Sequence, residues 1–155
     1  MYAHTSDTIV GWRAKLYDRL MGVFGATRVY EKALALLDLS EGQRLLDVGC
    51  GTGTFLKLAQ KKFPNARCMG IDASADMLTE ARKMADSSIV FTEADASALP
   101  FPNESIGWVI SILAFHHMPD GIKIRAVQEI ARVLRPGGKC LIADFGRANT
   151  VWGSF

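Results

Sequence analysis

One short run of residues limits the fold of this chain more than any other. Residues 45–48, Leu-Leu-Asp-Val, form an apolar strand candidate that leads directly into Gly49-Cys50-Gly51-Thr52-Gly53. An amphipathic segment, 54–62, follows. A strand, a glycine-rich turn and a helix in this order are typical of a nucleotide-binding α/β unit. The glycines permit positive φ and a close approach of the backbone, and we expect their amides to meet polar groups of a ligand.

The remaining sequence alternates between strand and helix candidates. Strands are predicted at 44–48, 67–71, 88–92, 108–113 and 138–145, and helices at 8–24, 28–37, 54–62, 75–84 and 122–134. Pro136-Gly137-Gly138 predicts a helix stop and a turn before the last strand. Alternation of this kind favours a parallel sheet with helices on both faces. We expect one compact unit, in which 40–155 form the α/β domain and the helices of 1–39 cover its site.

Composition and charge argue against several classes of protein. The net charge is only +2 and basic residues do not cluster, so a nucleic-acid partner is not expected. No apolar run approaches the ~20 residues of a membrane-spanning helix, and the N-terminus lacks the pattern of a secretory signal. The cysteines Cys50, Cys68 and Cys140 are few and far apart, which predicts reduced thiols in a cytoplasmic protein.

Asp47 distinguishes the glycine turn from that of a dinucleotide site. A dinucleotide places its pyrophosphate at this turn, where a fixed carboxylate would repel it. A ligand with ammonium and sulfonium charges would instead be attracted, and S-adenosylmethionine (SAM) is such a ligand. An NAD-dependent dehydrogenase remains the alternative that Asp47 argues against.

The ordered motifs together resemble one family. Asp47 with its three glycines, Asp72, the stretch 93–101 and the segment 129–139 are similar to motifs of the class I SAM-dependent methyltransferases. The resemblance extends over 12–145, and it is strongest to the ubiquinone/menaquinone-biosynthesis-like methyltransferase type 11 group. It implies a Rossmann-like three-layer sandwich with strand order 3-2-1-4-5, SAM as the cofactor and S-adenosylhomocysteine as the product.

The family's fold has two further strands, which are missing here because only 146–155 follow the fifth strand. The fifth strand would then be a sheet edge, and such edges pair readily with another chain. We therefore expect a homodimer or larger assembly through this edge; the alternative is that the N-terminal helices or residues 152–155 cover it.

Spacing and resemblance together predict a set of cofactor-binding residues at the strand ends. Asp72 lies nineteen positions after Gly53, close to the ~20 expected for a ribose-binding acid; the alternative is a helix cap, for which Ser74 is better suited. The resemblance assigns the adenine amino group to Asp95 and the adenine ring to the amide of Ala96, against the alternative of a solvated loop. The full set is Asp47, Gly49, Cys50, Gly51, Asp72, Ala73, Met77, Asp95, Ala96 and Ile112.

The segment after the fourth strand bears on the methyl acceptor. Methyltransferases that modify amide or adenine nitrogens carry an Asn-Pro-Pro-Tyr-like motif where this chain has 112–115, Ile-Leu-Ala-Phe, which argues against that substrate class. His116 and His117 are candidates for removing a proton from a substrate hydroxyl, because imidazole titrates near neutrality. The alternative is that they only pack and form local hydrogen bonds. With His4 remote, the histidines do not have the spacing of a metal site.

The sequence thus predicts methyl transfer from SAM to a carbon or oxygen atom of a small molecule. Tyr17 and Arg28, in the N-terminal helices, are further candidates for the mouth of the site. A non-catalytic SAM-binding module that needs a partner is the alternative from another class of protein.

Overall fold

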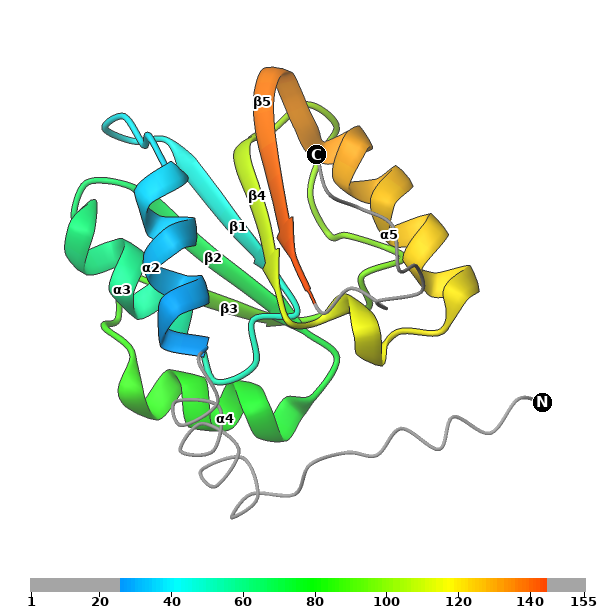
Figure 1. Ribbon diagram of the computed structural model, residues 1–155, viewed down its shortest axis with the longest axis horizontal. Coiled ribbons are helices and arrows are strands. Elements are labelled where there is room, and N and C mark those ends of the chain that lie inside the picture. The colour runs from blue at the N-terminus through cyan, green and yellow to red at the C-terminus, as the bar shows by residue number, and fades with distance from the viewer. Residues whose placement is uncertain (1–25, 145–155) are drawn as a thin grey trace, which may run out of the picture.

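The computed structural model describes residues 26–144, which contain a five-stranded sheet of order β3-β2-β1-β4-β5. The strands are β1 (Arg44–Val48), β2 (Arg67–Asp72), β3 (Val90–Glu93), β4 (Ile106–Ile112) and β5 (Leu134–Ala143). The helices are α2 (Ala26–Leu36), α3 (Thr54–Lys62), α4 (Ala75–Met84), α5 (Asp120–Val133) and the 3₁₀ helix η1 (Phe115–His117) (Figure 1). The helix predicted at 8–24, with Tyr17, lies outside the described residues.

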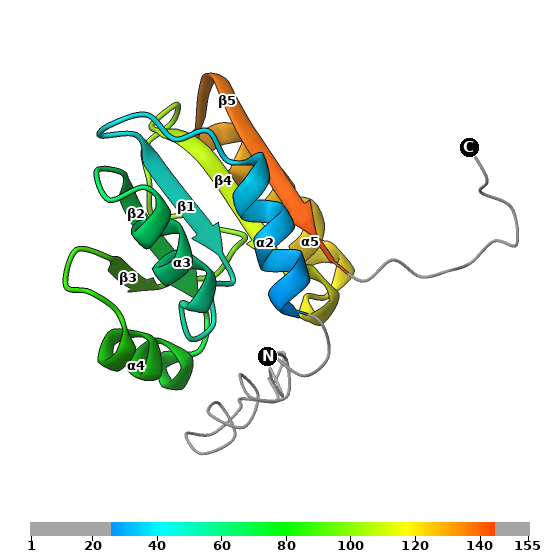
Figure 2. The ribbon, with the colours of Figure 1, turned by 60° about the vertical axis from the view of Figure 1, so that its left-hand side comes forward.

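Two apolar cores lie on opposite faces of the sheet. On one face, α2, α3 and α4 pack against side chains that include Leu45, Cys68 and Ile110. On the other face, α5 and the loop between β3 and β4 cover Leu46 and Val109. Figure 2 shows α2 and α3 in front of the sheet and α5 behind it. The predicted three-layer sandwich and strand order are therefore confirmed.

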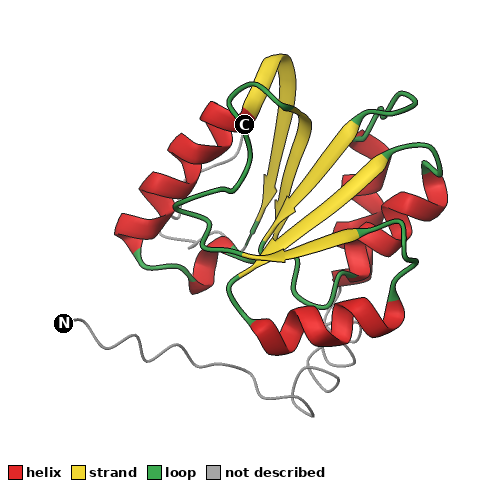
Figure 3. Ribbon diagram, turned by 180° about the vertical axis from the view of Figure 1, so that it is seen from behind, coloured by secondary structure: helices red, strands yellow, loops and turns green. Residues whose placement is uncertain are grey.

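All neighbouring strands are parallel, so their carboxyl ends lie together along one side of the sheet, its carboxyl edge (Figure 3). The interior strand β4 is buried at every position, as expected for a strand covered on both faces. Loops that leave these carboxyl ends carry most of the candidate residues. The fold thus gathers residues that are distant in sequence along one edge.

The fifth strand differs most from its prediction, because it begins at Leu134 rather than at 138. Leu134 pairs with Ile106, but the next pair joins Lys139 to Trp108, so the intervening residues form an irregular insertion within the strand. Gly137, at φ +74°, permits this distortion. The predicted turn is real but lies inside the strand.

Other boundaries shift by at most two residues. Helix α5 covers Asp120–Val133 instead of 122–134, and β4 covers Ile106–Ile112 instead of 108–113. Strand β4 ends where Leu113 adopts φ +55°, which takes the chain out of the sheet. Helices α3 and α4 have the predicted bounds.

Candidate active site

Two glycines of the turn differ in the space that surrounds them. Gly49 has φ +78°, and a Cβ there would lie 2.5 Å from the Cβ of Ala114. Gly51 has φ +54° and open space at its missing Cβ. The turn therefore passes close to Ala114, two residues after the end of β4, and has open space at Gly51.

The amides of this turn are engaged within the protein. Those of Gly49 and Cys50 both donate to the carbonyl of Ile71 at 2.9 Å, and that of Gly53 donates to Cys50. The amide of Gly51 donates to Oδ2 of Asp72 at 2.8 Å. The glycine amides thus have partners within the protein, which is unfavourable for a pyrophosphate that needs free donors at this turn.

Asp47 lies one residue before the end of β1 and is only 3% exposed. Within the described part of the chain, its Oδ1 is buried without a hydrogen-bond partner. Burial, reinforced by the nearby Asp72, raises the pKa of Asp47 to about 8. The expected fixed anion is thus mostly protonated at neutral pH, and a cation placed beside it would favour the ionised form.

Asp72, at the end of β2, holds two loops together. Its Oδ2 accepts from Gly51, and its Oδ1 accepts from the amide of Ser74 at 2.9 Å. Ser74 is the N-cap of α4, and its hydroxyl accepts from the amide of Met77. Burial raises the pKa of Asp72, although the two backbone hydrogen bonds oppose that rise. An ionised carboxylate has about four lone-pair sites, so Asp72 retains acceptor capacity for ribose hydroxyls.

Asp95 follows β3 at the same edge of the sheet. Its Oδ1 accepts from the amide of Ser97 at 2.7 Å, which forms a tight turn. Ala96 is buried against the core under α5, at 8% exposure. The remaining predicted cofactor-binding residues differ in exposure. Cys50, Met77 and Ile112 are buried, and Ala73 is exposed.

The paired histidines lie on η1, where the chain leaves β4. Nδ1 of His116 lies 2.7 Å from Oδ1 of Asp144, and the amide of His116 donates to Oδ2 of Asp144 at 2.9 Å. The rings of His116 and His117 are 3.8 Å apart between centroids. Burial lowers the pKa of His117, and its neighbour His116 adds to that effect.

Asp144 is a residue that the sequence interpretation missed. It follows β5 directly, as Asp95 follows β3, and acids at strand ends were the available signal. Its partner is 28 positions away, so no local spacing connects the two. Arg28, in contrast, is exposed on α2.

Other kinds of site find no support in 26–144. No group of three or more metal-ligating side chains occurs there, and no helix of that region is long and apolar enough to cross a membrane. Cys50, Cys68 and Cys140 are free thiols.

The carboxyl edge of the sheet therefore defines a class of protein: a Rossmann-like α/β protein with acids at the ends of three adjacent strands. Asp47 lies in β1, Asp72 ends β2 and Asp95 lies in the loop after β3, and these three strands are neighbours in the sheet. Acceptors in this order suit a ligand that carries a cation, vicinal hydroxyls and an amino group. SAM has all three, so the residues present fit this cofactor.

Comparison with known proteins agrees with this class. The methyltransferase domain family matches residues 45–138, and the chain belongs to that family. It is 36% identical over 125 residues to 27-O-demethylrifamycin SV methyltransferase of Amycolatopsis mediterranei, covering 77% of this chain and 44% of that protein. It is 34% identical over 137 residues to demethylmenaquinone methyltransferase of Thermus thermophilus, covering 86% of this chain and 61% of that protein.

Solved structures give the same result. Phosphoethanolamine N-methyltransferase 2 of Haemonchus contortus, in complex with SAM, superposes with a TM-score of 0.61 at 32% identity. That match covers 68% of this chain and 25% of the nematode protein. The chain spans about half the length of the curated relatives it matches.

Proposed function

We propose that this chain binds SAM and transfers its methyl group to a hydroxyl oxygen of a small molecule, with S-adenosylhomocysteine as the product. The observation that carries the proposal is the row of acids at the strand ends, Asp47, Asp72 and Asp95, beside a turn whose glycine amides already have partners. This arrangement suits SAM and is unfavourable for the pyrophosphate of NAD.

Each acid has a separate role toward the cofactor. Asp47 loses its proton when SAM binds, and its carboxylate pairs with the methionine ammonium group. Asp72 accepts from the ribose hydroxyls, and Asp95 with the amide of Ala96 recognises adenine. Gly49, Gly51, Cys50, Ala73, Met77 and Ile112 form the surrounding walls.

The pair His116–Asp144 supports an acceptor that loses a proton, such as a hydroxyl group. A carboxylate only accepts, so the 2.7 Å contact keeps a proton on Nδ1 of His116 and puts the basic lone pair on Nε2. An imidazole oriented in this way can remove the proton of a hydroxyl as the oxygen attacks. The cofactor supplies a methyl group that its sulfonium has already activated, so the protein's main task is to position the acceptor.

The molecular setting follows from the same residues. The partner is a small-molecule acceptor, since the net charge of +2 gives no support for nucleic acid. The three free thiols support a reducing compartment, the cytoplasm.

Two measurements test the proposal. SAM and S-adenosylhomocysteine are expected to raise the melting temperature, because binding to the folded state stabilises it; NAD is expected to have no effect. A shift with NAD and none with SAM would contradict the proposal. Incubation with labelled SAM and a metabolite extract then identifies what is methylated, and SAM affinity without any turnover would favour the non-catalytic module.

The acceptor atom has its own test. Asp144→Asn is expected to lower kcat on a hydroxyl acceptor by about 10²-fold, at the low end of the effect of general-base catalysis, with little change in the Kd of SAM. Glu31→Gln, an exposed acid on α2, is the control. An unchanged kcat would remove the support for an oxygen acceptor.

A further inference from the structure

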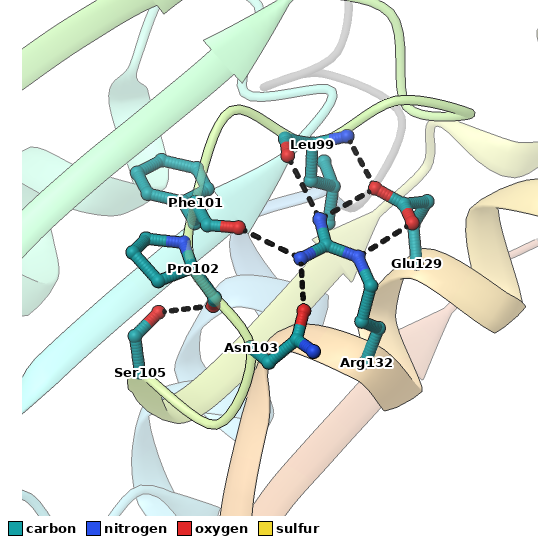
Figure 4. Close-up of polar contacts among 7 residues, drawn as sticks. All are labelled: Leu99, Phe101, Pro102, Asn103, Ser105, Glu129 and Arg132. Atoms are coloured by element: carbon teal, nitrogen blue, oxygen red, sulfur yellow. Dashed lines mark hydrogen bonds and ion pairs between the residues drawn. The ribbon is translucent and has the colours of Figure 1, made fainter.

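Two side chains of α5, Glu129 and Arg132, bind the loop between β3 and β4 (Figure 4). The guanidinium of Arg132 donates to the carbonyls of Leu99 and Phe101, both at 2.9 Å, and to Oδ1 of Asn103 at 2.8 Å. It also donates from Nε and Nη2 to the two carboxylate oxygens of Glu129, both at 2.7 Å. Guanidinium carries five N–H donors, so these five contacts match its full capacity.

Leu99 is the point of the loop that is held most firmly. Oε2 of Glu129 accepts from the amide of Leu99 at 2.7 Å, while Arg132 donates to the carbonyl of the same residue. The Leu99 side chain is 4% exposed and belongs to the core under α5, with Phe115 and Ile130. Both polar groups and the side chain of one residue are thus fixed against one helix.

The turn that presents Asp95 lies immediately before this point. At its upstream end, the amide of Ala94 donates to the last carbonyl of β2 at 3.1 Å. Within the turn, Asp95 accepts from Ser97 through its side chain and from Ala98 through its carbonyl. The turn ends at Ala98, and the next residue is Leu99. The strand therefore fixes one end of the turn and the Glu129–Arg132 pair fixes the other.

Helix α5 does not depend on the pair for its own docking. Ala126 and Val133 are 0% exposed and Ile130 is 3% exposed, so the apolar face of the helix is buried independently. The side chains of Arg132 and Glu129 are only partly buried, at 32% and 20% exposure. Loss of the pair is therefore expected to act on the loop more than on the core.

We propose that Glu129 and Arg132 are positioning residues for adenine recognition, because they set where the Asp95 carboxylate and the Ala96 amide lie. This inference rests on the proposed function, in which that loop meets the base of SAM. The planar guanidinium group of Arg132 is needed to reach two carbonyls, an amide oxygen and a carboxylate at once. Lysine carries the same charge but only three donors on one atom, so it cannot replace arginine here.

The test compares two ligands that differ only at the base. S-adenosylhomocysteine offers its amino group to Asp95, whereas S-inosylhomocysteine places an oxygen there. We expect the wild-type chain to prefer the adenosyl compound by about tenfold or more, the effect of losing a charge-assisted hydrogen bond. Asp95→Asn is expected to abolish that preference and calibrates the assay.

Arg132→Lys is expected to weaken binding of the adenosyl compound by about tenfold while changing the inosyl compound by about twofold, measured by titration calorimetry. The preference for adenine then falls, which a purely structural role would not cause. Lys123→Ala, which removes an ion pair with Asp120 on the same helix, is the matched control and is expected to leave the preference unchanged.

The outcomes separate the two proposals. Absence of S-adenosylhomocysteine binding by the wild-type chain overturns the proposed function, and the positioning role fails with it. Wild-type binding with an unchanged preference in Arg132→Lys, even at a lowered melting temperature, overturns the positioning role alone. If Arg132→Lys does not fold, Glu129→Gln replaces it; the same fall in preference supports the role and an unchanged preference overturns it.

Discussion

Replacing Asp47 with asparagine is expected to stabilise the ligand-free protein and to weaken cofactor binding. The carboxyl is 3% exposed, and its pKa lies at about 8 in the folded protein against an ordinary value of 3.8. The folded state therefore keeps a proton that the unfolded state releases at lower pH. Asparagine has a similar shape and no proton to lose, so it avoids this pH-dependent cost.

The magnitude follows from the two pKa values. Between the unfolded pKa of 3.8 and pH 7, the free energy of unfolding falls by about 1.36 kcal/mol per pH unit. The total loss is about 4 kcal/mol relative to a side chain that does not titrate. Water that reaches the ionised carboxylate reduces this cost, so we expect a gain of about 2 to 4 kcal/mol from Asp47→Asn at pH 7. The gain is absent below the unfolded pKa, grows as pH rises, and becomes constant above about pH 8.

Urea denaturation of both proteins at about pH 4 and about pH 8 measures this difference. Glu41→Gln, an exposed acid in the turn before β1, is the control and is expected to show no such pH dependence. The same Asp47→Asn protein is expected to bind SAM more weakly, because the neutral amide cannot pair with an ammonium group. An effect on stability that is equal at both pH values, or a destabilisation at pH 8, would refute the reasoning.

Three further substitutions or measurements have clear expectations. Asp72→Ala is expected to weaken S-adenosylhomocysteine binding by about 1.5 to 3 kcal/mol in calorimetry, and to lower stability as well, because two amides lose their acceptor. Gly49→Ala is expected to cost about 2 to 4 kcal/mol of unfolding free energy, because the strained φ and the 2.5 Å approach to Ala114 combine. Gly51→Ala has open space and is expected to cost about 1 kcal/mol. Equal effects of the two substitutions would contradict this. Sedimentation velocity is expected to show a dimer through the edge of β5 that Ile142→Lys, at a 42% exposed position, dissociates; a wild-type monomer would contradict that expectation.

Local signals explain which elements could be predicted from the sequence. Helix α3 begins after Gly53 and α4 after the N-cap Ser74, and both helices have the predicted bounds. The start of β5 was wrong, because Pro136-Gly137-Gly138 is a strong turn signal. The pairing that makes Leu134 part of the strand comes from β4, 28 positions earlier at Ile106, and is not encoded in the local pattern.

The candidate site divides in the same way. Asp72 was predicted from its spacing to the glycine turn, which is a local feature of the sequence, and Asp95 from the family resemblance; both stay predictions as cofactor contacts. The protonation of Asp47 was not predictable, since it depends on burial and on Asp72. The partnership of His116 with Asp144 depends on two adjacent strands ending at the same edge of the sheet, which only the fold shows.

The engagement of the glycine turn has an evolutionary consequence. The amide of Gly51 can be released only by removing Asp72, which also anchors Ser74 and offers the remaining acceptor sites for a ribose. A substitution that removed the Asp72 carboxylate would free the Gly51 amide and at the same time remove the acceptor of Ser74, the N-cap of α4. A stepwise path toward phosphate binding at this turn therefore passes through a less stable protein.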